Sequence, residues 1–334
     1  MLCNELSIAK KYTKNPVILA VSEQPKETLY YVPDSSLPAL SCSVDPFSLL
    51  THQELFELKK KYRAPQSLIR KMRQAYSEEC DTIELGDDVS LEKKLFCENV
   101  EDIILSKIKH QYRNQSANFF PYYDPKETSQ RTLHTLVVGS SSVGKSWTTS
   151  QIIQRNFNDS SVSACYIFSP TAKSDPSWQN LRKALGKKCK LINSNEVSVC
   201  IPLSQIAKGS IVVVDDPDST TQPSKDYILQ LMSEILYHGR HHSTNNVGCT
   251  VFSICHDAWA NNIGTRSSTL EASRIILFPL LNKSVATKFL SKRCHYTAKE
   301  IKRMFNFLKR GDRWACIYQH YPNCLICKHG ALLL

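Results

Sequence analysis

Short apolar runs alternate with polar, helix-compatible segments from residue 131 onward. The apolar runs are "HTLVV" (134–138), "ACYIFS" (164–169), "CKLI" (189–192), "SIVVVDD" (210–216), "CTVFSIC" (249–255) and "SRIILFP" (273–279). Near-continuous apolar runs of this length are typical of parallel strands that are covered on both faces. The pattern therefore predicts a doubly wound, mostly parallel α/β sheet, with "CKLI" as an edge strand.

Residues 1–125 have a less regular pattern, which predicts a mixed α/β extension in front of the sheet. Within it, "SLLTHQELFELKKKYR" predicts a helix with Thr51 as N-cap, Glu54 three residues later, and Pro65 ending or kinking it. Apolar residues at helical spacing predict a second helix at about 90–110. "FFPYYDPKE" (119–127) is expected to be a linker. The predicted domains are thus the extension at 1–125, a core at 126–315 and a Cys-containing tail at 316–334.

A phosphate-binding motif follows the first apolar run of the predicted sheet. The segment "GSSSVGKS" has the spacing G-x-x-x-x-G-K-S, between a predicted strand and a predicted helix. Glycines let the backbone wrap a phosphate, and the helix N-terminus attracts the negative charge. Lys145 is expected to reach the β and γ phosphates, and the Ser146 hydroxyl to ligate Mg²⁺. The nucleotide-binding residues are Gly139, Ser140, Ser141, Ser142, Val143, Gly144, Lys145 and Ser146.

Two acidic residues end the apolar run "IVVVDD". A parallel strand places its last residues at the edge of the sheet where phosphate loops lie. We assign Asp215 to the water shell of the Mg²⁺ ion and Asp216 to the polarisation of the attacking water. The alternative is an Asp-rich turn in which Asp218 caps the next segment. With the loop motif, these residues predict a P-loop NTPase core.

The order of these motifs resembles the viral DNA-packaging ATPases of the poxvirus type, within the FtsK/HerA superfamily. The resemblance covers about residues 131–295 and includes "LVVGSSSVGKS", "YIFSPTAKSDPSW", "IVVVDDPDS", "LYHGRHHSTNNVGCTVFSICHDAW" and "NNIGTRSSTLEASRIILF". It implies a RecA-like fold and a ring, commonly hexameric, that hydrolyses ATP to drive double-stranded DNA into a preformed capsid. Capsid or portal proteins are the implied partners, and the implied location is the host cytoplasm or nucleus at sites of virion assembly, or the virion.

The resemblance also suggests two further catalytic positions. His256 stands where the family usually has a polar sensor, often Gln, that contacts the γ-phosphate or the water, and Asp257 is the neighbouring fallback. Arg266 stands where the family places an arginine that could reach the ATP of a neighbouring subunit. Arg240 and, more weakly, Arg274 are the competing candidates for that arginine, and a helix-capping surface role is the structural alternative.

The charge of the chain supports a polyanionic partner. Lysine and arginine outnumber the acids enough to give a net charge of +11. The excess is clustered in "LKKKYRAPQSLIRKMR" (58–73), in "RKALGKKCK" (182–190) and between Lys288 and Arg313. Solvated helix faces would give the same composition, but clustering beside an NTPase motif favours nucleic acid. No apolar run approaches 18 residues and no signal peptide is apparent, so we expect an intracellular protein without a membrane span.

Three groups of residues have less specific signals. Most of the 13 cysteines are expected to be reduced core residues. In the tail, Cys316, His320, Cys324, Cys327 and His329 allow a zinc site, although a mobile reduced tail is the preferred interpretation. His238, His241 and His242 have metal-like spacing, but a DNA-facing or interface helix end is preferred. Trp147 is expected to pack the loop helix against the sheet, with base stacking as the alternative.

The leading function is therefore an ATP-driven motor that translocates double-stranded DNA. Three alternatives stay open: a helicase-like nucleic-acid NTPase, a phosphotransferase acting on a small molecule, and an assembly protein that binds ATP without hydrolysing it. The segment "NNIGTRSSTLEASR" is short and Ser/Thr-rich for a phosphotransferase lid. Asp216 argues against a non-hydrolysing binder, which has no need of a second acid.

Overall fold

The structure is a computed structural model. It describes residues 4–7, 17–23, 26–33, 50–70, 92, 95–97, 99–100, 111–124, 132–157, 162–238, 248–256, 271–279, 283–309, 311–320 and 322–334. The chain divides into two compact units. The first contains Met1–Ile18, Thr28–Arg113 and Leu333, and the second contains Leu19–Glu27, Asn114–Leu332 and Leu334.

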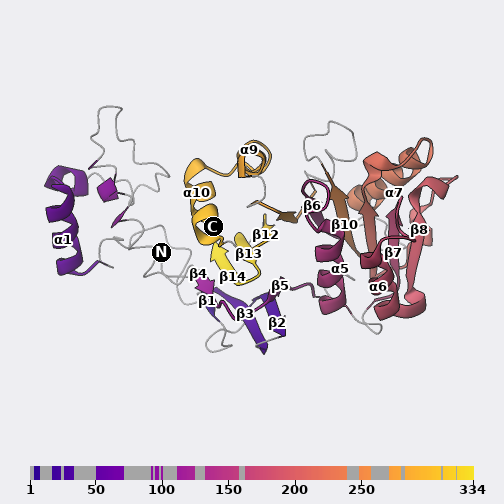
Figure 1. The fold of residues 1–334 in the computed structure, drawn as a ribbon, viewed down its shortest axis with the longest axis horizontal. Helices are drawn as coiled ribbons and strands as arrows, with labels where there is room; N and C mark the ends of the chain where they lie inside the picture. The colour runs from indigo at the N-terminus through magenta and orange to yellow at the C-terminus, as the bar shows by residue number, and fades with distance from the viewer. Residues whose placement is uncertain are drawn as a thin grey trace. The chain divides into compact units, whose positions relative to one another are not determined.

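The first unit contains the N-terminal strand β1, the helix α1 and the strand β4. Strand β1 (Asn4–Ser7) pairs antiparallel with β3 (Lys26–Pro33), most of which belongs to the same unit, and β4 spans Gln111–Arg113. Helix α1 (His52–Tyr62) begins at the predicted cap, where Thr51 and Glu54 form a reciprocal capping box. It ends with Arg63 in the left-handed conformation, ahead of Pro65. The helix predicted from this segment is confirmed (Figure 1).

The predicted second helix of the extension is described only in part. Residues 92, 95–97 and 99–100 are helical, and the rest of the 90–110 segment lies outside the described residues. Phe96 and Val100 are fully buried and pack with Leu58 and Ile69 in one apolar cluster. The first unit therefore has a small core of its own.

The second unit is built on one large sheet. Its strands are β6 (Leu133–Val138), β7 (Cys165–Ser169), β8 (Cys189–Asn193), β9 (Ser210–Asp215), β10 (Cys249–Cys255), β11 (Arg274–Leu277), β12 (Ala315–Tyr318), β13 (Cys324–Cys327) and β14 (Gly330–Leu333). They lie in the order β14-β13-β12-β11-β6-β10-β9-β7-β8 (Figure 1). The pairs from β11 through β6, β10, β9 and β7 to β8 are parallel, and β11–β12 and β12–β13 are antiparallel.

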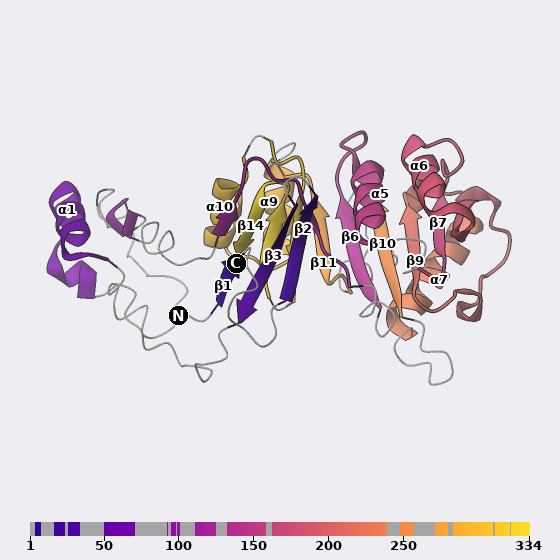
Figure 2. The same ribbon diagram turned by 90° about the horizontal axis from the view of Figure 1, so that it is seen from below.

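Helices cover both faces of the parallel strands. The helices are α5 (Lys145–Asn156), α6 (Pro176–Leu185), α7 (Ser224–His238), α9 (Lys283–Lys292) and α10 (Ala298–Phe307), and short 3₁₀ turns lie at Gly186–Lys188, Ser194–Glu196, Leu203–Gln205 and Pro217–Ser219. On β9, Val212 and Val214 pack against α7. Because side chains alternate along a strand, Asp215 points to the other face, where it meets Trp178 of α6. The predicted doubly wound, mostly parallel sheet of a RecA-like P-loop core is confirmed, with β8 at its edge (Figure 1). Figure 2 shows its strands β11, β6, β10, β9 and β7 side by side in that order.

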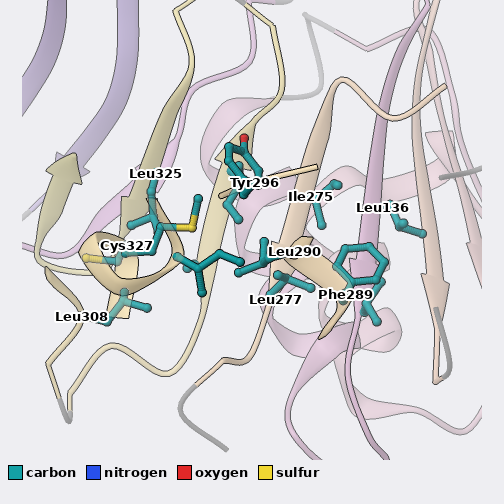
Figure 3. Packing of buried hydrophobic residues seen from close by; sticks show 14 of the residues in the cluster. Leu136, Ile275, Leu277, Phe289, Leu290, Tyr296, Leu308, Leu325 and Cys327 are labelled. Atoms are coloured by element: carbon teal, nitrogen blue, oxygen red, sulfur yellow. The ribbon is translucent and has the colours of Figure 1, made fainter. Parts of the chain in front are cut away.

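The C-terminal strands correct the expectation of a mobile tail. Strands β12, β13 and β14 extend the sheet. Helix α9 packs with them in one apolar cluster through Phe289 and Leu290 (Figure 3), and α10 through Met304. The segments "CIY", "CLIC" and "ALLL" are continuously apolar, so their burial in the sheet is favoured over exposure to solvent. Strands β12, β13 and β14 therefore belong to the large sheet.

The zinc alternative for this region is also wrong. Cys324 and Cys327 are three residues apart on strand β13, so they point to opposite faces of the sheet, and both are fully buried. The Nδ1 atom of His329 lies 3.0 Å from the carbonyl oxygen of Ala117, and His320 is exposed. Among the described residues, no group of three His, Cys, Asp or Glu residues has an arrangement that could hold a metal ion.

The segment predicted as a linker is part of the second unit's core. Strand β5 (Phe119–Pro121) pairs antiparallel with β2 (Val17–Glu23), and Phe119, Phe120 and Tyr123 are buried. The Phe119 N–H donates to the carbonyl oxygen of Lys328 at 2.7 Å. The linker prediction is therefore wrong for residues 119–124, because aromatic residues dominate the segment and favour burial. Residues 125–127 lie outside the described residues.

Arg274 is enclosed between two aromatic rings. Its guanidinium carbon lies 3.9 Å from the ring centre of Tyr123 and 4.3 Å from that of Tyr318. Such contacts hold the cation within its own subunit, so Arg274 is excluded as the arginine that reaches a neighbouring ATP.

None of the described helices is long and apolar enough to cross a membrane.

Candidate functional site: the phosphate loop and its paired acids

The loop "GSSSVGKS" joins the carboxyl end of β6 to the N-terminus of α5. Gly144 has φ +100°, a conformation that glycine adopts without strain, and Ser142 has φ +64°. A Cβ atom at Gly139 would lie 3.0 Å from both Phe278 and Val143, so this position has no room for a side chain. Both glycines of the motif are therefore required, Gly144 by its backbone conformation and Gly139 by the lack of space for a side chain.

Lys145 folds back over the loop that it follows. Its Nζ atom donates to the carbonyl oxygens of Gly139 at 2.7 Å and Ser140 at 2.9 Å, and it lies 3.0 Å from Nδ1 of His256. Burial lowers the pKa of Lys145, and the nearby carboxylates of Asp215 and Asp216 oppose that shift. The amino group is thus held beside the loop, where a bound phosphate could replace its present partners.

Asp215 lies at the end of β9 with one carboxylate oxygen fully engaged. Its Oδ2 accepts from Trp178 Nε1 at 2.9 Å and from Ser169 Oγ at 3.1 Å, and it lies 3.5 Å from Ser146 Oγ. Burial raises the pKa of Asp215, while the hydrogen bonds from Trp178 and Ser169 lower it. A hydroxyl and a carboxylate facing each other beside a phosphate loop are the hard oxygen donors that Mg²⁺ prefers, so these residues fit the ion.

We expect the Asp215→Asn variant to be more stable than the wild type at pH 7. The wild-type chain keeps a carboxylate that burial disfavours, and Asn can still accept hydrogen bonds from Trp178 and Ser169. The folded-state pKa is raised, so the cost appears as the pH rises through that pKa and is fully present at neutral pH. The unfolding temperature of the variant should rise by about 2–4 °C for each kcal/mol that the substitution adds to the free energy of unfolding.

Thermal unfolding of both proteins between pH 3.5 and 7.5 measures this effect. The advantage of Asp215→Asn should shrink as the pH falls, because below the unfolded pKa both states of the wild type are protonated. A variant that is less stable at neutral pH would contradict the account of Asp215 as a carboxylate whose charge the fold disfavours.

Asp216 and His256 contact each other beside the phosphate loop. Strand β10 lies between β6 and β9, so His256, just past the end of β10, is placed between the loop and Asp216. His256 Nε2 lies 3.2 Å from Asp216 Oδ2, and Ser219 Oγ donates to the same oxygen. Lysine is only a donor, so Nδ1 of His256 accepts from Lys145 and the ring proton on Nε2 points at Asp216.

The backbone at Asp216 is unusual. The residue has φ +51° and ψ +59°, a left-handed conformation that Asp tolerates better than most residues. Its N–H donates to the carbonyl oxygen of Ile254 at 3.0 Å, which ties it to β10, and the 3₁₀ turn Pro217–Ser219 begins directly after it. The chain thus turns sharply after Asp215, and the two adjacent acids take different surroundings. Asp215 is buried against α6, whereas Asp216 is only partly buried beside His256.

A cavity of about 410 Å³ connects these groups. Its walls include Lys145, Ser146, Asp215, Asp216 and His256, all of which were predicted from the sequence. The structure therefore brings the predicted loop, acids and sensor together, while the roles assigned to them stay predictions. Sequence reasoning missed three supporting residues, Ser169, Trp178 and Ser219. The first two belong to "YIFSPTAKSDPSW", a segment used for the resemblance but given no chemical role.

Several predicted positions lie outside the described residues. They are Arg266, Asp257, Arg240, His241 and His242. The backbone of His238 ends α7, but its side chain is likewise not described. The predictions of a trans-acting arginine and of a DNA-facing helix end are therefore unchanged.

Trp147 differs from its prediction. The side chain does not pack the loop helix against the sheet, because the residue is 52% exposed. It lies on the first turn of α5 and lines the cavity together with Gly144. The packing role that we expected from the sequence is wrong.

Comparisons with known proteins give only distant similarities. The sequence matches no protein-family model and no curated protein. Among solved structures, the DNA-packaging ATPase B204 of Sulfolobus turreted icosahedral virus is 14% identical with a TM-score of 0.38, covering 60% of this chain and 98% of that one. Its counterpart from Sulfolobus turreted icosahedral virus 2, a genome packaging NTPase bound to ATP-gammaS, is 11% identical with a TM-score of 0.33, covering 64% and 100%.

A third similar structure comes from a cellular protein. EssC of Geobacillus thermodenitrificans, in a structure of its ATPases 2 and 3, is 13% identical with a TM-score of 0.36, covering 67% of this chain and 42% of that one. TM-scores and identities this low do not carry a functional argument. The function is therefore inferred from the geometry of the site.

Proposed function

We propose that this chain hydrolyses ATP with Mg²⁺ and uses the energy to translocate double-stranded DNA, as the motor of viral genome packaging. The observation that carries the proposal is the pair of adjacent acids in different surroundings. Asp215 lies beside Ser146, and Asp216 lies beside His256 at the same end of the cavity. In such a pair, one acid can help to hold the metal ion while the other activates the attacking water.

Asp216 is the proposed general base. Its Oδ2 is held by Ser219 and His256, whereas its Oδ1 has no hydrogen-bond partner among the described residues. A carboxylate fixed by two donors can accept a proton from a water molecule through its other oxygen. His256 contributes orientation, because it contacts both Asp216 and Lys145.

The other loop residues bind and orient the phosphates. In the proposed complex, Lys145 exchanges its bonds to the carbonyl oxygens of Gly139 and Ser140 for bonds to the β and γ phosphates. Ser146 and Asp215 would hold Mg²⁺, which when bound supplies positive charge to the phosphate oxygens. Trp178 is buried and donates a hydrogen bond to Asp215, so its indole ring excludes water from that side of the site.

DNA is the proposed polyanion because of the charge distribution. The net charge is +11. Helix α1 contributes Lys59, Lys60 and Lys61 in its last turn, and Lys60 and Lys61 are exposed. A homo-oligomeric ring, commonly a hexamer, and a capsid or portal partner are proposed from the resemblance over residues 131–295, as is a location at sites of virion assembly.

The basic segment around α1 gives a prediction about DNA affinity. Replacing Lys59, Lys60, Lys61, Arg70 and Lys71 with Ala is expected to weaken the salt dependence of DNA binding. Each phosphate contact that is lost should reduce the slope of log K against log salt by about 0.9. Fluorescence anisotropy with a duplex across a salt titration measures the slope, and an unchanged slope would rule out this segment as a DNA contact.

Displacement of a triplex-forming strand from a long duplex tests translocation itself. The proposed motor should displace the strand only with ATP and Mg²⁺, and should do so faster on duplex tracks than on single-stranded tracks. Hydrolysis without displacement would reject translocation and favour an NTPase of another kind.

A further inference from the structure

A second cavity lies next to the phosphate-loop cavity in the same unit. It has a volume of about 470 Å³ and shares Gly144 and Trp147 with the first cavity. The two cavities therefore meet at the N-terminus of α5. A Cβ atom at Gly144 would meet no atom within 4 Å, so the loop leaves open space at this junction.

The direction of a bound nucleotide follows from the chemistry of the first cavity. Lys145, Asp216 and His256 mark the end where the γ-phosphate belongs. A nucleotide whose γ-phosphate points to that end must leave the loop on the opposite side, past Gly144 and Trp147. The second cavity is the space beyond these two residues.

Aromatic side chains form the walls of the second cavity. Phe120, Phe278 and Trp314 are buried, and Trp147 is 52% exposed at the cavity's junction with the loop. The rings of Phe120 and Trp314 have centres 5.6 Å apart. An exposed indole beside a phosphate loop gains energy when a flat ring covers it, because base–aromatic stacking contributes about 1–3 kcal/mol per base.

One neutral polar side chain on the cavity wall can read a base. Asn118 has both a donor and an acceptor in its amide, and its backbone N–H is fixed by Ser22 Oγ at 3.0 Å. An amide matches the paired donor and acceptor of adenine, whereas guanine presents two acceptors on its corresponding edge. Lys328 and Arg313 also line the cavity, and their charges suit the ribose end near the α-phosphate.

We propose that this cavity is the nucleobase site of the chain and that it prefers adenine, with Trp147 stacking on the base and Asn118 reading its edge. The inference rests on the proposed ATP-binding function and adds to it the part of the nucleotide that the loop motif does not address. It also gives a role to segments outside the resemblance, since Asn118, Phe120, Trp314 and Lys328 all lie beyond residues 131–295.

Calorimetric titration of the full chain with three ligands tests the inference. The ligands are a non-hydrolysable ATP analogue, its GTP counterpart and inorganic tripolyphosphate, each with Mg²⁺. The wild type should bind the ATP analogue more tightly than the other two. Trp147→Ala should weaken binding of the ATP analogue by about 5- to 150-fold, the range given by stacking energies, without changing tripolyphosphate binding.

Matched variants separate stacking from general damage. Trp147→Phe should retain most of the affinity, and Asn118→Ala should reduce the preference for ATP over GTP. Phe56→Ala removes another exposed aromatic side chain, 65% exposed on α1, and should change nothing.

The outcomes distinguish this inference from the proposed function. Binding of tripolyphosphate as tight as that of the ATP analogue would overturn the base site and leave the phosphate loop intact. Equal weakening of both ligands by Trp147→Ala would also overturn it, because the indole would then act on the phosphates. A wild type that binds none of the three ligands would overturn the inference together with the ATP-binding function.

Discussion

Replacing Asp216 with asparagine is expected to slow ATP hydrolysis by about 10²- to 10⁴-fold, which is the usual contribution of a positioned general base. Asn keeps the size of the side chain, can accept from Ser219, and tolerates the left-handed backbone at this position. It cannot take a proton from water. Affinity for ATP should change little, because Asp216 lies at the hydrolytic end of the cavity rather than on the loop.

The neighbouring acid Asp218 provides the control. Its carboxylate pairs with Lys225 at 2.8 Å, so it is engaged outside the proposed chemistry. Asp218→Asn should hydrolyse ATP at nearly the wild-type rate. Multiple-turnover rates and binding of a non-hydrolysable analogue should be measured for both variants. Equal rates for Asp216→Asn and the wild type would remove Asp216 from the mechanism and revive the Asp-rich turn as its only role.

Replacing Lys145 with alanine is expected to weaken ATP binding by about 100-fold or more and to abolish measurable hydrolysis. The proposed contacts to two phosphates are charge-assisted hydrogen bonds, each contributing about 1.5–3 kcal/mol. Lys190→Ala is the matched control, since Lys190 lies on the edge strand β8 with its amino group 5.0 Å from the ring centre of Tyr166. Equilibrium binding of a fluorescent ATP analogue measures the difference.

The same variant should not lose stability at neutral pH. Burial lowers the pKa of Lys145 in the folded chain, so the charged amino group carries a cost that is present at pH 7 and is relieved as the pH rises. Removing it should leave the unfolding temperature equal or higher. A large drop in unfolding temperature would mean that the binding defect reports misfolding, and the assignment of Lys145 to the phosphates would lose its support.

Local sequence signals predicted the parallel strands and the loop because each depends on nearby residues. The apolar run 210–216 forms β9, and the motif at Gly139–Ser146 joins a strand to a helix as expected. The capping box at Thr51 likewise needs only residues three apart. Such patterns reflect the preference of a short segment for one environment, and tertiary packing did not reverse them.

The misjudged segments depend on distant contacts. "FFPYYD" was expected to be a linker, yet Phe119 bonds to Lys328, more than 200 residues away. The CxxC at 324–327 suggested a zinc half-site, but in a strand this spacing separates the two thiols. Trp147 was expected to pack the loop helix against the sheet, whereas the fold leaves it half exposed where two cavities meet. No local pattern reports which residues meet across the sheet.

The most direct test of the central claim is steady-state ATP hydrolysis by the purified chain with and without long double-stranded DNA. Lys145→Ala and Asp216→Asn are measured in parallel. The proposed motor predicts strong stimulation by duplex DNA that is lost in both variants. Hydrolysis indifferent to DNA, or tight ATP binding without hydrolysis, would contradict a DNA-translocating motor and favour a phosphotransferase or an assembly protein.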